Sequence, residues 1–224
     1  MTNELIFLGH SALVASITLG LLVLGREGLT AGVCLFSVLS NLFVTKQITL
    51  FGLHTISTDV FTIGAVFGLN LLQEHFGIAS VKRAITCNFA LLIAYLALCQ
   101  VHLAYAPNMF DTMQAASQAL LTPMLRIIVA SVASYLLSQL FDMHLYRLLK
   151  QYFAGRHVVL RNILSLSCSQ LVDTAFFSFA ALYGTVHSVG HVIIVSYAVK
   201  MLVVVGISPF IGLSKKLLRY IPHA

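Results

Sequence analysis

The chain alternates between long apolar runs and short polar breaks. Seven runs have about the length of 20 residues that a helix needs to cross a bilayer. They cover roughly residues 5–24, 29–44, 55–72, 84–105, 121–146, 163–183 and 189–211. Each run is expected to be a helix, because an open strand would leave backbone polar groups unpaired in lipid. The run 29–44 is the shortest, which suits a tilted or partly re-entrant helix.

Composition and charge agree with a membrane protein. Of the 224 residues, 59% are hydrophobic and only 9% are charged, whereas soluble domains carry about 25% charged residues. A soluble fold of this size could not bury so much apolar surface. The sequence therefore predicts an all-α, multi-pass membrane helix bundle of seven spans, with residues 1–224 forming one transmembrane domain. The net charge of +6 does not indicate nucleic acid binding, because the basic residues form no continuous stripe.

The basic residues predict the orientation of the chain in the membrane. With seven spans, one side receives Lys46, with Arg126 just inside the fifth span on that side. The other side receives Arg26, Lys82, Arg83, Arg147, Lys150, Arg156, Arg161, Lys215, Lys216 and Arg219. The side rich in Lys and Arg is usually cytoplasmic. The N-terminus is therefore expected outside the cell and the C-terminus inside.

Polar residues inside the apolar runs concentrate in the last three spans. A polar group within lipid is costly and usually faces a cavity or a partner helix, so these residues indicate a functional site. One pattern occurs twice: Ser-Gln-Leu-Phe-Asp at 138–142 and Ser-Gln-Leu-Val-Asp at 169–173. Each places an amide and a carboxylate on the same helical face. Such a pair can donate to and accept from a planar hydrogen-bonding ligand.

Depth in the membrane links two charged residues. Asp173 and Lys200 each lie about ten residues from an end of their span, which is roughly 15–17 Å at 1.5 Å per residue. We therefore expect Asp173 and Lys200 to form a charge pair near the middle of the bilayer. The alternative is that Lys200 bonds to Asp142 or to backbone carbonyls.

Other motifs are not present in the sequence. It has no phosphate-binding loop, no H-E-x-x-H and no G-x-S-x-G, so transport would draw energy from an ion gradient, a partner ATPase or trapping of the cargo. His187 and His191 have helical spacing but no carboxylate or cysteine companion, so no metal site and no cofactor are expected. The cysteines lack C-x-x-C spacing and are expected to be buried small apolar residues; they are Cys34, Cys87, Cys99 and Cys168.

The polar residues resemble those of the vitamin uptake transporter family. The most specific part is the run from Arg126 to Asp142, R-I-I-V-A-S-V-A-S-Y-L-L-S-Q-L-F-D. The likeness continues through Ser169-Gln170-Leu-Val-Asp173-Thr174, Lys200 with Pro209 beyond it, Ser40-Asn41 and Glu74-His-Phe-Gly77. It covers roughly residues 31–216.

The resemblance implies a transporter rather than an enzyme. Characterised members of the family are queuosine precursor transporters of the bacterial cytoplasmic (inner) membrane. The implied cargo is a 7-deazaguanine base such as queuine, preQ0 or preQ1. The implied fold is similar to the six-helix substrate-binding components of energy-coupling-factor transporters, with residues 5–24 as an added N-terminal helix.

The chemistry of a deazaguanine suits the polar residues of the spans. Carboxylates can accept hydrogen bonds from its N–H groups, and a cation can donate to its carbonyl oxygen. Amides can both donate and accept. Analogues that leave these protein groups unpaired are therefore disfavoured. The expected substrate-binding residues are Asn41, Asn70, Glu74, Arg126, Ser134, Gln139, Asp142, Gln170, Asp173 and Lys200. Relatives often carry an aspartate at position 70, where this chain has asparagine.

Two other functions remain open from the sequence. One is a substrate-binding membrane subunit for another small vitamin, working with an ATPase module. The other is an intramembrane enzyme in which the carboxylates and Lys200 act as acid and base. A coupling ATPase and a second copy of the chain are the open partners besides the bilayer and the small-molecule substrate.

Overall fold

The computed structural model describes residues 2–153 and 158–202, and helices dominate this part of the chain. The helices are α1 (Asn3–Leu22), α2 (Gly25–Phe43), α3 (Asp59–Leu103), α4 (Gln114–Leu121), α5 (Met124–Tyr152) and α6 (Val158–Leu182). A further apolar helix, Val189–Leu202, follows α6; we call it the last helix. Residues 203–211 of the seventh expected span, with Pro209, lie outside the described residues.

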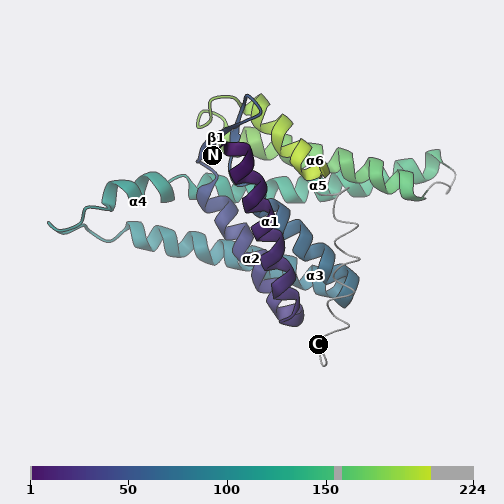
Figure 1. Ribbon diagram of the computed structural model, residues 1–224, viewed down its shortest axis with the longest axis horizontal. Helices are drawn as coiled ribbons and strands as arrows, with labels where there is room; N and C mark the ends of the chain where they lie inside the picture. The colour runs from purple at the N-terminus through teal and green to yellow at the C-terminus, as the bar shows by residue number, and fades with distance from the viewer. Residues whose placement is uncertain (1, 154–157, 203–224) are drawn as a thin grey trace.

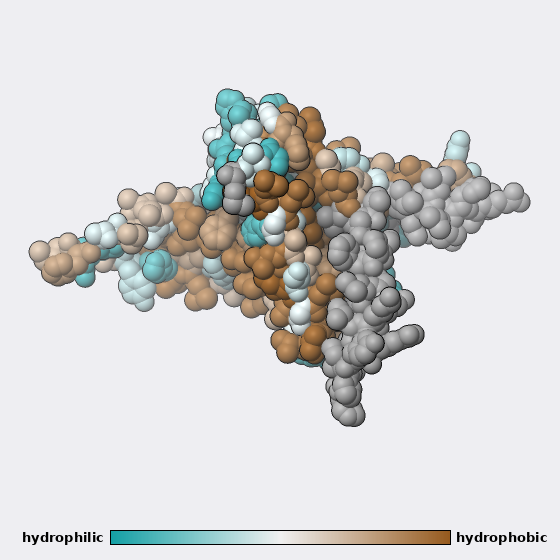
Figure 2. Space-filling view, in the orientation of Figure 1, coloured by the Kyte–Doolittle hydropathy of each residue, from teal (hydrophilic) through white to brown (hydrophobic). Residues whose placement is uncertain are grey.

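The apolar runs account for the membrane-spanning character of the helices. Among the described residues, the segments Asn3–Leu22, Asp59–Leu103 and Gln114–Leu149 are long and apolar enough to cross a membrane, and Val189–Leu202 is a shorter apolar helix. Large apolar side chains lie on the outside, including Leu8, Leu13 and Leu98. Figure 2 shows the hydrophobic surface over α1 and α2, while hydrophilic residues gather at the end that holds β1. Such a surface suits lipid contact.

No loop separates the third and fourth expected spans, because α3 runs through the break between them. The two parts of α3 are separated only at Gly77, which has φ 78° and ψ 170°. This backbone conformation is open to glycine and costly for other residues. The polar residues of the break at 73–83 are therefore helical on either side of one glycine. Beyond it, the second part of α3 extends towards α4 (Figure 1).

The expectation of an all-α fold needs one correction. Strands β1 (Gln47–Leu50) and β2 (Leu53–Ile56) form an antiparallel hairpin in the break before α3. Phe51 and Gly52 have φ values of 50° and 80°, and two consecutive positive φ values match the twist of paired strands. The hairpin contacts the start of α1, where Glu4 Oε1 accepts from the Phe51 N–H at 3.0 Å. It lies at one end of the molecule, and its last two residues, Thr55 and Ile56, fall within the third expected span, so the helix begins later than expected, at Asp59.

Two groups of helices cross in the fold. Figure 1 shows α1 and α2 running at a steep angle to α5 and α6, and the first part of α3 packs with α1 and α2. Gly64 and Gly68 lie where these helices approach closely: a Cβ at Gly64 would meet Val14 and lie 2.9 Å from Phe36. The absence of a side chain at these glycines therefore allows the helices to pack closely.

The apolar core is divided into clusters along the helices. One cluster includes Leu29, near the start of α2, and Phe67, in the first part of α3. Another includes Val44 and Ile56, together with residues of α5, α6 and the last helix. On α2, the stretch 37–41, with Ser37, Ser40 and Asn41, contributes to neither cluster. It faces the crossing of the two helix groups, where the polar residues lie.

Candidate functional site

A cavity of about 220 Å³ lies where the two helix groups cross. Its walls come from α2, both parts of α3, α5, α6 and the last helix; we call it the central cavity. The sequence places a cavity among the third, fifth, sixth and seventh spans. The structure adds the second and fourth spans, so more of the chain surrounds the cavity than the sequence indicates.

A buried charge pair forms one wall of the central cavity. Lys200 Nζ lies 2.7 Å from Asp173 Oδ2, and it also donates to Thr174 Oγ1 at 3.0 Å. The other carboxylate oxygen of Asp173 accepts from Ser134 Oγ at 2.9 Å. The side chains of Lys200 and Asp173 are only 14% and 22% exposed. The pairing expected from their depth is therefore confirmed.

Two asparagine amides face the same space from α2 and α3. Asn41 is 5% exposed, and its Nδ2 donates to the Ser37 carbonyl at 2.7 Å. Asn88 Oδ1 is buried and has no hydrogen-bond partner among the described residues. A buried acceptor without a partner carries a desolvation cost of about 1–3 kcal/mol. A ligand N–H at this position would remove that cost.

Aromatic rings complete the lining of the central cavity. The ring centroids of Phe89 and Tyr135 lie 4.9 Å apart at an interplanar angle of 67°. The remaining aromatic residues of the lining are Phe36, Phe61 and Phe177. Such rings offer flat apolar surfaces for a planar ligand, while the amides and the charge pair offer directional hydrogen bonds.

The two copies of the Ser-Gln-x-x-Asp pattern have different environments. Asp173 lines the central cavity, whereas Asp142 does not; Asp142 Oδ1 instead accepts from Ser165 Oγ at 2.6 Å. Gln139 is exposed and Gln170 is half-buried, and neither lines the central cavity. The structure thus brings together one carboxylate of the repeated pattern with Lys200, and it leaves the other on the α5–α6 contact.

Arg126, near the start of α5, contacts the end of α6 and does not line the central cavity. Its Nε donates to the Ala180 carbonyl at 2.7 Å, and a terminal nitrogen donates to the Tyr183 carbonyl at 2.8 Å. The last carbonyls of a helix have no partner within it, and a cation is favourable there. Arg126 therefore has a structural role as a cap of α6.

The remaining expected residues lie on α3. Asn70 is half-buried and Glu74 is exposed, close to the break at Gly77. Neither contributes to the central cavity. The structure therefore brings together Asn41, Ser134, Asp173 and Lys200 from the set that the sequence suggests.

Sequence reasoning missed Asn88 and Tyr135. Asn88 is an amide within the apolar run 84–105, so the rule that marks polar residues in spans applies to it as well. Tyr135 lies within the fifth span and is easily taken for an ordinary apolar residue. The expected burial of the cysteines is wrong for Cys168, which is exposed, and holds for Cys34 and Cys99.

Histidines gather near the hairpin rather than near the central cavity. The rings of His54 and His187 have centroids 4.8 Å apart, and those of His54 and His191 are 5.9 Å apart. The described residues hold no group of three or more His, Cys, Asp or Glu side chains arranged to bind a metal ion. These rings accordingly serve here as contacts between β2 and the segment after α6.

These features define a helical membrane protein whose helices surround a polar and aromatic cavity. The chain belongs to the family described as "Putative vitamin uptake transporter", whose model matches residues 57–214. It is also 28% identical, over 87% of its own length and 86% of the relative's, to a protein of Bacillus subtilis (strain 168) named "Probable queuosine precursor transporter". No solved structure matches the chain. The resemblance inferred from the polar residues is thereby confirmed for the family.

Proposed function

We propose that the protein imports a 7-deazaguanine base, a precursor of queuosine, across the bacterial cytoplasmic membrane. The family description and the name of the Bacillus subtilis relative support uptake of a small molecule of this kind. The residues of the central cavity support the choice of a base. Queuine, preQ0 and preQ1 share the fused ring system and the guanine-like hydrogen-bonding edge.

The observation that carries this proposal is the buried Asn88 Oδ1, which has no partner among the described residues. Asn88 lines the central cavity together with Asn41 and the pair of Asp173 and Lys200. A guanine-like edge presents N–H and amino donors beside a carbonyl acceptor. The donors would bind Asn88 and Asp173, and Lys200 would donate to the carbonyl oxygen.

The size and lining of the central cavity also favour a bare base. Pockets for drug-sized ligands have volumes of roughly 300–1,000 Å³, and the central cavity, at about 220 Å³, is smaller. Phe89 and Tyr135 provide flat apolar surfaces against which a fused ring can stack. A larger vitamin would have to displace these rings.

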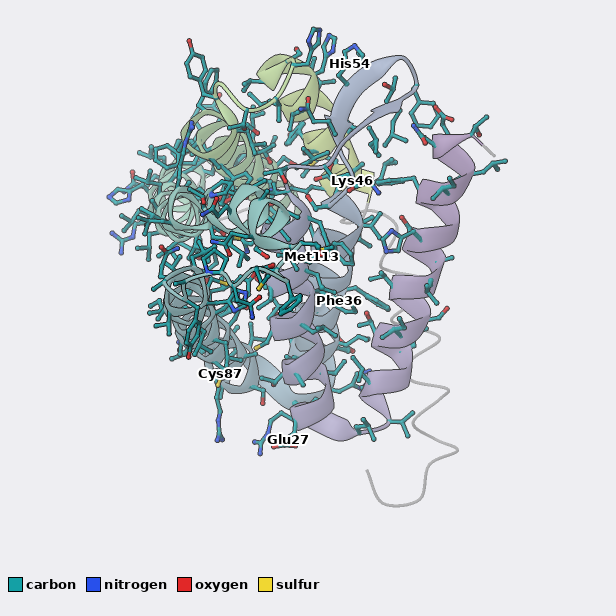
Figure 3. All side chains as sticks on the ribbon, turned by 90° about the vertical axis from the view of Figure 1, so that its left-hand side faces the viewer. Glu27, Phe36, Lys46, His54, Cys87 and Met113 are labelled. Carbon is teal, nitrogen blue, oxygen red and sulfur yellow. The ribbon has the colours of Figure 1, made fainter. Side chains whose placement is uncertain are left out.

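The topology that we propose has seven spans, with the N-terminus outside and the C-terminus in the cytoplasm. Seven helices in the described part of the chain correspond to the expected spans: α1, α2, the two parts of α3, α5, α6 and the last helix. Of these, α1, α3 and the segment that includes α5 are long and apolar enough to cross a membrane. Glu27 lies in the break between the first two expected spans, and Arg83 lies in the break between the third and the fourth. The two side chains are close enough for an electrostatic interaction, which supports placing both breaks on the same side of the membrane. The hairpin and the segment after α6 are joined at the opposite end by Gln47 and Thr185. In Figure 3, Glu27 and His54 mark these two ends.

Other parts of the proposal rest on the sequence. Likeness to the six-helix components of energy-coupling-factor transporters, a coupling ATPase and a second copy of the chain stay predictions. Direct roles in binding also stay predictions for the expected residues outside the central cavity, namely Asn70, Glu74, Arg126, Gln139, Asp142 and Gln170.

Uptake can be tested in cells that cannot make queuosine. Such cells would express the chain and keep the enzymes that convert the supplied base into queuosine in tRNA. Queuine, preQ0 and preQ1 would be supplied to separate cultures. Queuosine in tRNA, measured by mass spectrometry of digested tRNA, should appear with at least one base only when the chain is present. If none of the three bases restores queuosine while the protein is in the membrane, the proposed function is wrong.

Two amide substitutions test the location of the site. Asn88→Ala removes the buried acceptor, and loss of one such hydrogen bond should weaken binding by about 1–3 kcal/mol, or roughly 5–150-fold. Gln100→Ala is the matched control, because Gln100 lies on the same part of α3 yet is exposed and outside the cavity. Uptake at limiting base should fall for Asn88→Ala and stay unchanged for Gln100→Ala. The reverse result would place the site outside the central cavity.

A further inference from the structure

A second, smaller cavity of about 50 Å³ adjoins the central cavity. We call it the side cavity. Its polar lining consists of six hydroxyl side chains, the carboxyl group of Asp59 and the ammonium group of Lys200. Ser40 and Lys200 line both cavities. The space is large enough for a water molecule and too small for a base.

Asp59 is the most buried carboxyl group that faces these cavities. It is the first residue of α3 and is only 4% exposed. Its Oδ2 accepts from Ser196 Oγ of the last helix at 2.8 Å. The N-terminus of α3 favours a negative charge locally, but burial removes the water that would otherwise solvate a carboxylate. A buried carboxylate therefore needs a charged partner or a proton.

The charges around the side cavity do not balance. Asp59 and Asp173 supply two carboxylates, from α3 and α6, and Lys200 supplies one ammonium from the last helix. Among the described residues, α2 contributes only the hydroxyl of Ser40 as a polar group of the side cavity, and α5 contributes no residue to its lining. Lys200 is already paired with Asp173 at 2.7 Å. One negative charge is thus left at Asp59 when both carboxyl groups are ionised.

A proton balances this charge better than a metal ion does. Lys200 lines the same small space, so a metal cation in the side cavity would lie close to an ammonium group and be repelled. A proton converts Asp59 to a neutral acid, which keeps its hydrogen bond with Ser196 and removes the uncompensated charge. The hydroxyl lining can contact either form of the carboxyl group.

We propose that Asp59 binds a proton whose movement into the cell drives uptake, with Lys200 linking the side cavity to the central cavity. This inference rests on the proposed function. Asp59 takes up a proton facing outside and releases it facing the cytoplasm, so the charge beside Lys200 changes during the cycle. When Asp59 is ionised, it draws Lys200 towards the side cavity, away from the carbonyl oxygen of the base. Protonation of Asp59 leaves Lys200 with Asp173 in the central cavity, so the proton and the base bind together.

The experiment uses the full chain in liposomes, with labelled queuine, preQ0 and preQ1 as separate probes. Exchange of external labelled base for internal unlabelled base reports transport without any gradient. Accumulation is then measured with an acidic outside, with a sodium gradient and with neither. For the wild type we expect exchange, and accumulation only with the acidic outside. Absence of exchange for all three bases would overturn the proposed function, whereas exchange without a response to the pH gradient would overturn only this inference.

Asp59→Asn should keep exchange and lose accumulation, so that its uptake equals the level without a gradient. Asp111→Asn is the matched control, because Asp111 is an exposed carboxylate in the segment between α3 and α4, and it should behave as wild type. Accumulation driven by sodium alone, or by the pH gradient in Asp59→Asn, would refute the proton site.

A second variant keeps the test decisive if Asp59→Asn does not fold. Ser196→Ala removes the donor to Asp59 but keeps the carboxyl group. Because the ionised form loses a hydrogen bond, accumulation plotted against external pH should shift towards alkaline values. An unchanged pH profile in this variant would count against Asp59 as the proton-binding group.

Discussion

Replacing Lys200 by methionine should destabilise the protein strongly, because it leaves Asp173 as a buried carboxylate without its cation. Lys200 Nζ is 2.7 Å from Asp173 Oδ2, and both side chains are largely shielded from water. Removing one partner of a buried ion pair typically costs about 3–5 kcal/mol. Since the two side chains retain some exposure, we expect a value near the lower limit, about 3 kcal/mol.

This cost can be measured as a change in thermal stability in detergent. For a chain of this length, 1 kcal/mol shifts the melting temperature by about 2–4 °C, so Lys200→Met should lower it by roughly 6–12 °C. Asp173→Asn should have a similar effect, because it leaves the ammonium group unpaired. The double variant carries neither charge of the pair, and it should recover most of the loss.

The double variant also provides the decisive comparison. If the pair acts as the structure indicates, the two single losses do not add, and the coupling amounts to a few kcal/mol. Additive losses, with the double variant about 6 kcal/mol less stable than the wild type, would show that Lys200 and Asp173 act independently. That result would refute the pairing as a source of stability.

Two further substitutions test the packing and the helix end. Gly64→Leu should destabilise the contact of α1 with α3 by about 1–3 kcal/mol, because a Cβ at Gly64 already meets Val14; Gly9→Leu has open space and should be neutral in the same thermal assay. Arg126→Ala should lower the melting temperature by a few degrees, since the last carbonyls of α6 lose two hydrogen bonds, while the affinity for a base, measured by binding of labelled ligand, stays unchanged. Equal stability of the two glycine variants, or a loss of affinity for Arg126→Ala, would contradict these roles.

The helices and the charge pair could be predicted from the sequence because each follows from a strong local rule. About 20 consecutive apolar residues require a helix in lipid. Two ionisable residues at the same depth in neighbouring spans have few partners other than each other. Asp173 and Lys200 are ionisable, lie at the same depth and belong to neighbouring spans, and the structure brings them into contact.

The remaining features depend on conformation or on tertiary contact. The break in α3 depends on one glycine, Gly77, with a positive φ, and the polar residues around it do not indicate at which residue the helix is interrupted. The hairpin at 47–56 depends on the turn at Phe51 and Gly52. The two copies of the Ser-Gln-x-x-Asp pattern look equivalent in sequence, but their surroundings differ because each faces a different neighbour. No pattern within a single helix contains that information.

The glycine break in α3 gives the central cavity a natural pivot. Thr62 of the first part and Asn88 of the second part both line the cavity, on opposite sides of Gly77. Asn88 is eleven residues from Gly77, which is about 16 Å along a helix. A rotation of roughly 10° about Gly77 would therefore carry Asn88 about 3 Å, the length of a hydrogen bond. Under the proposed function, a change in the backbone of this one residue would be enough to make or release a contact with the base.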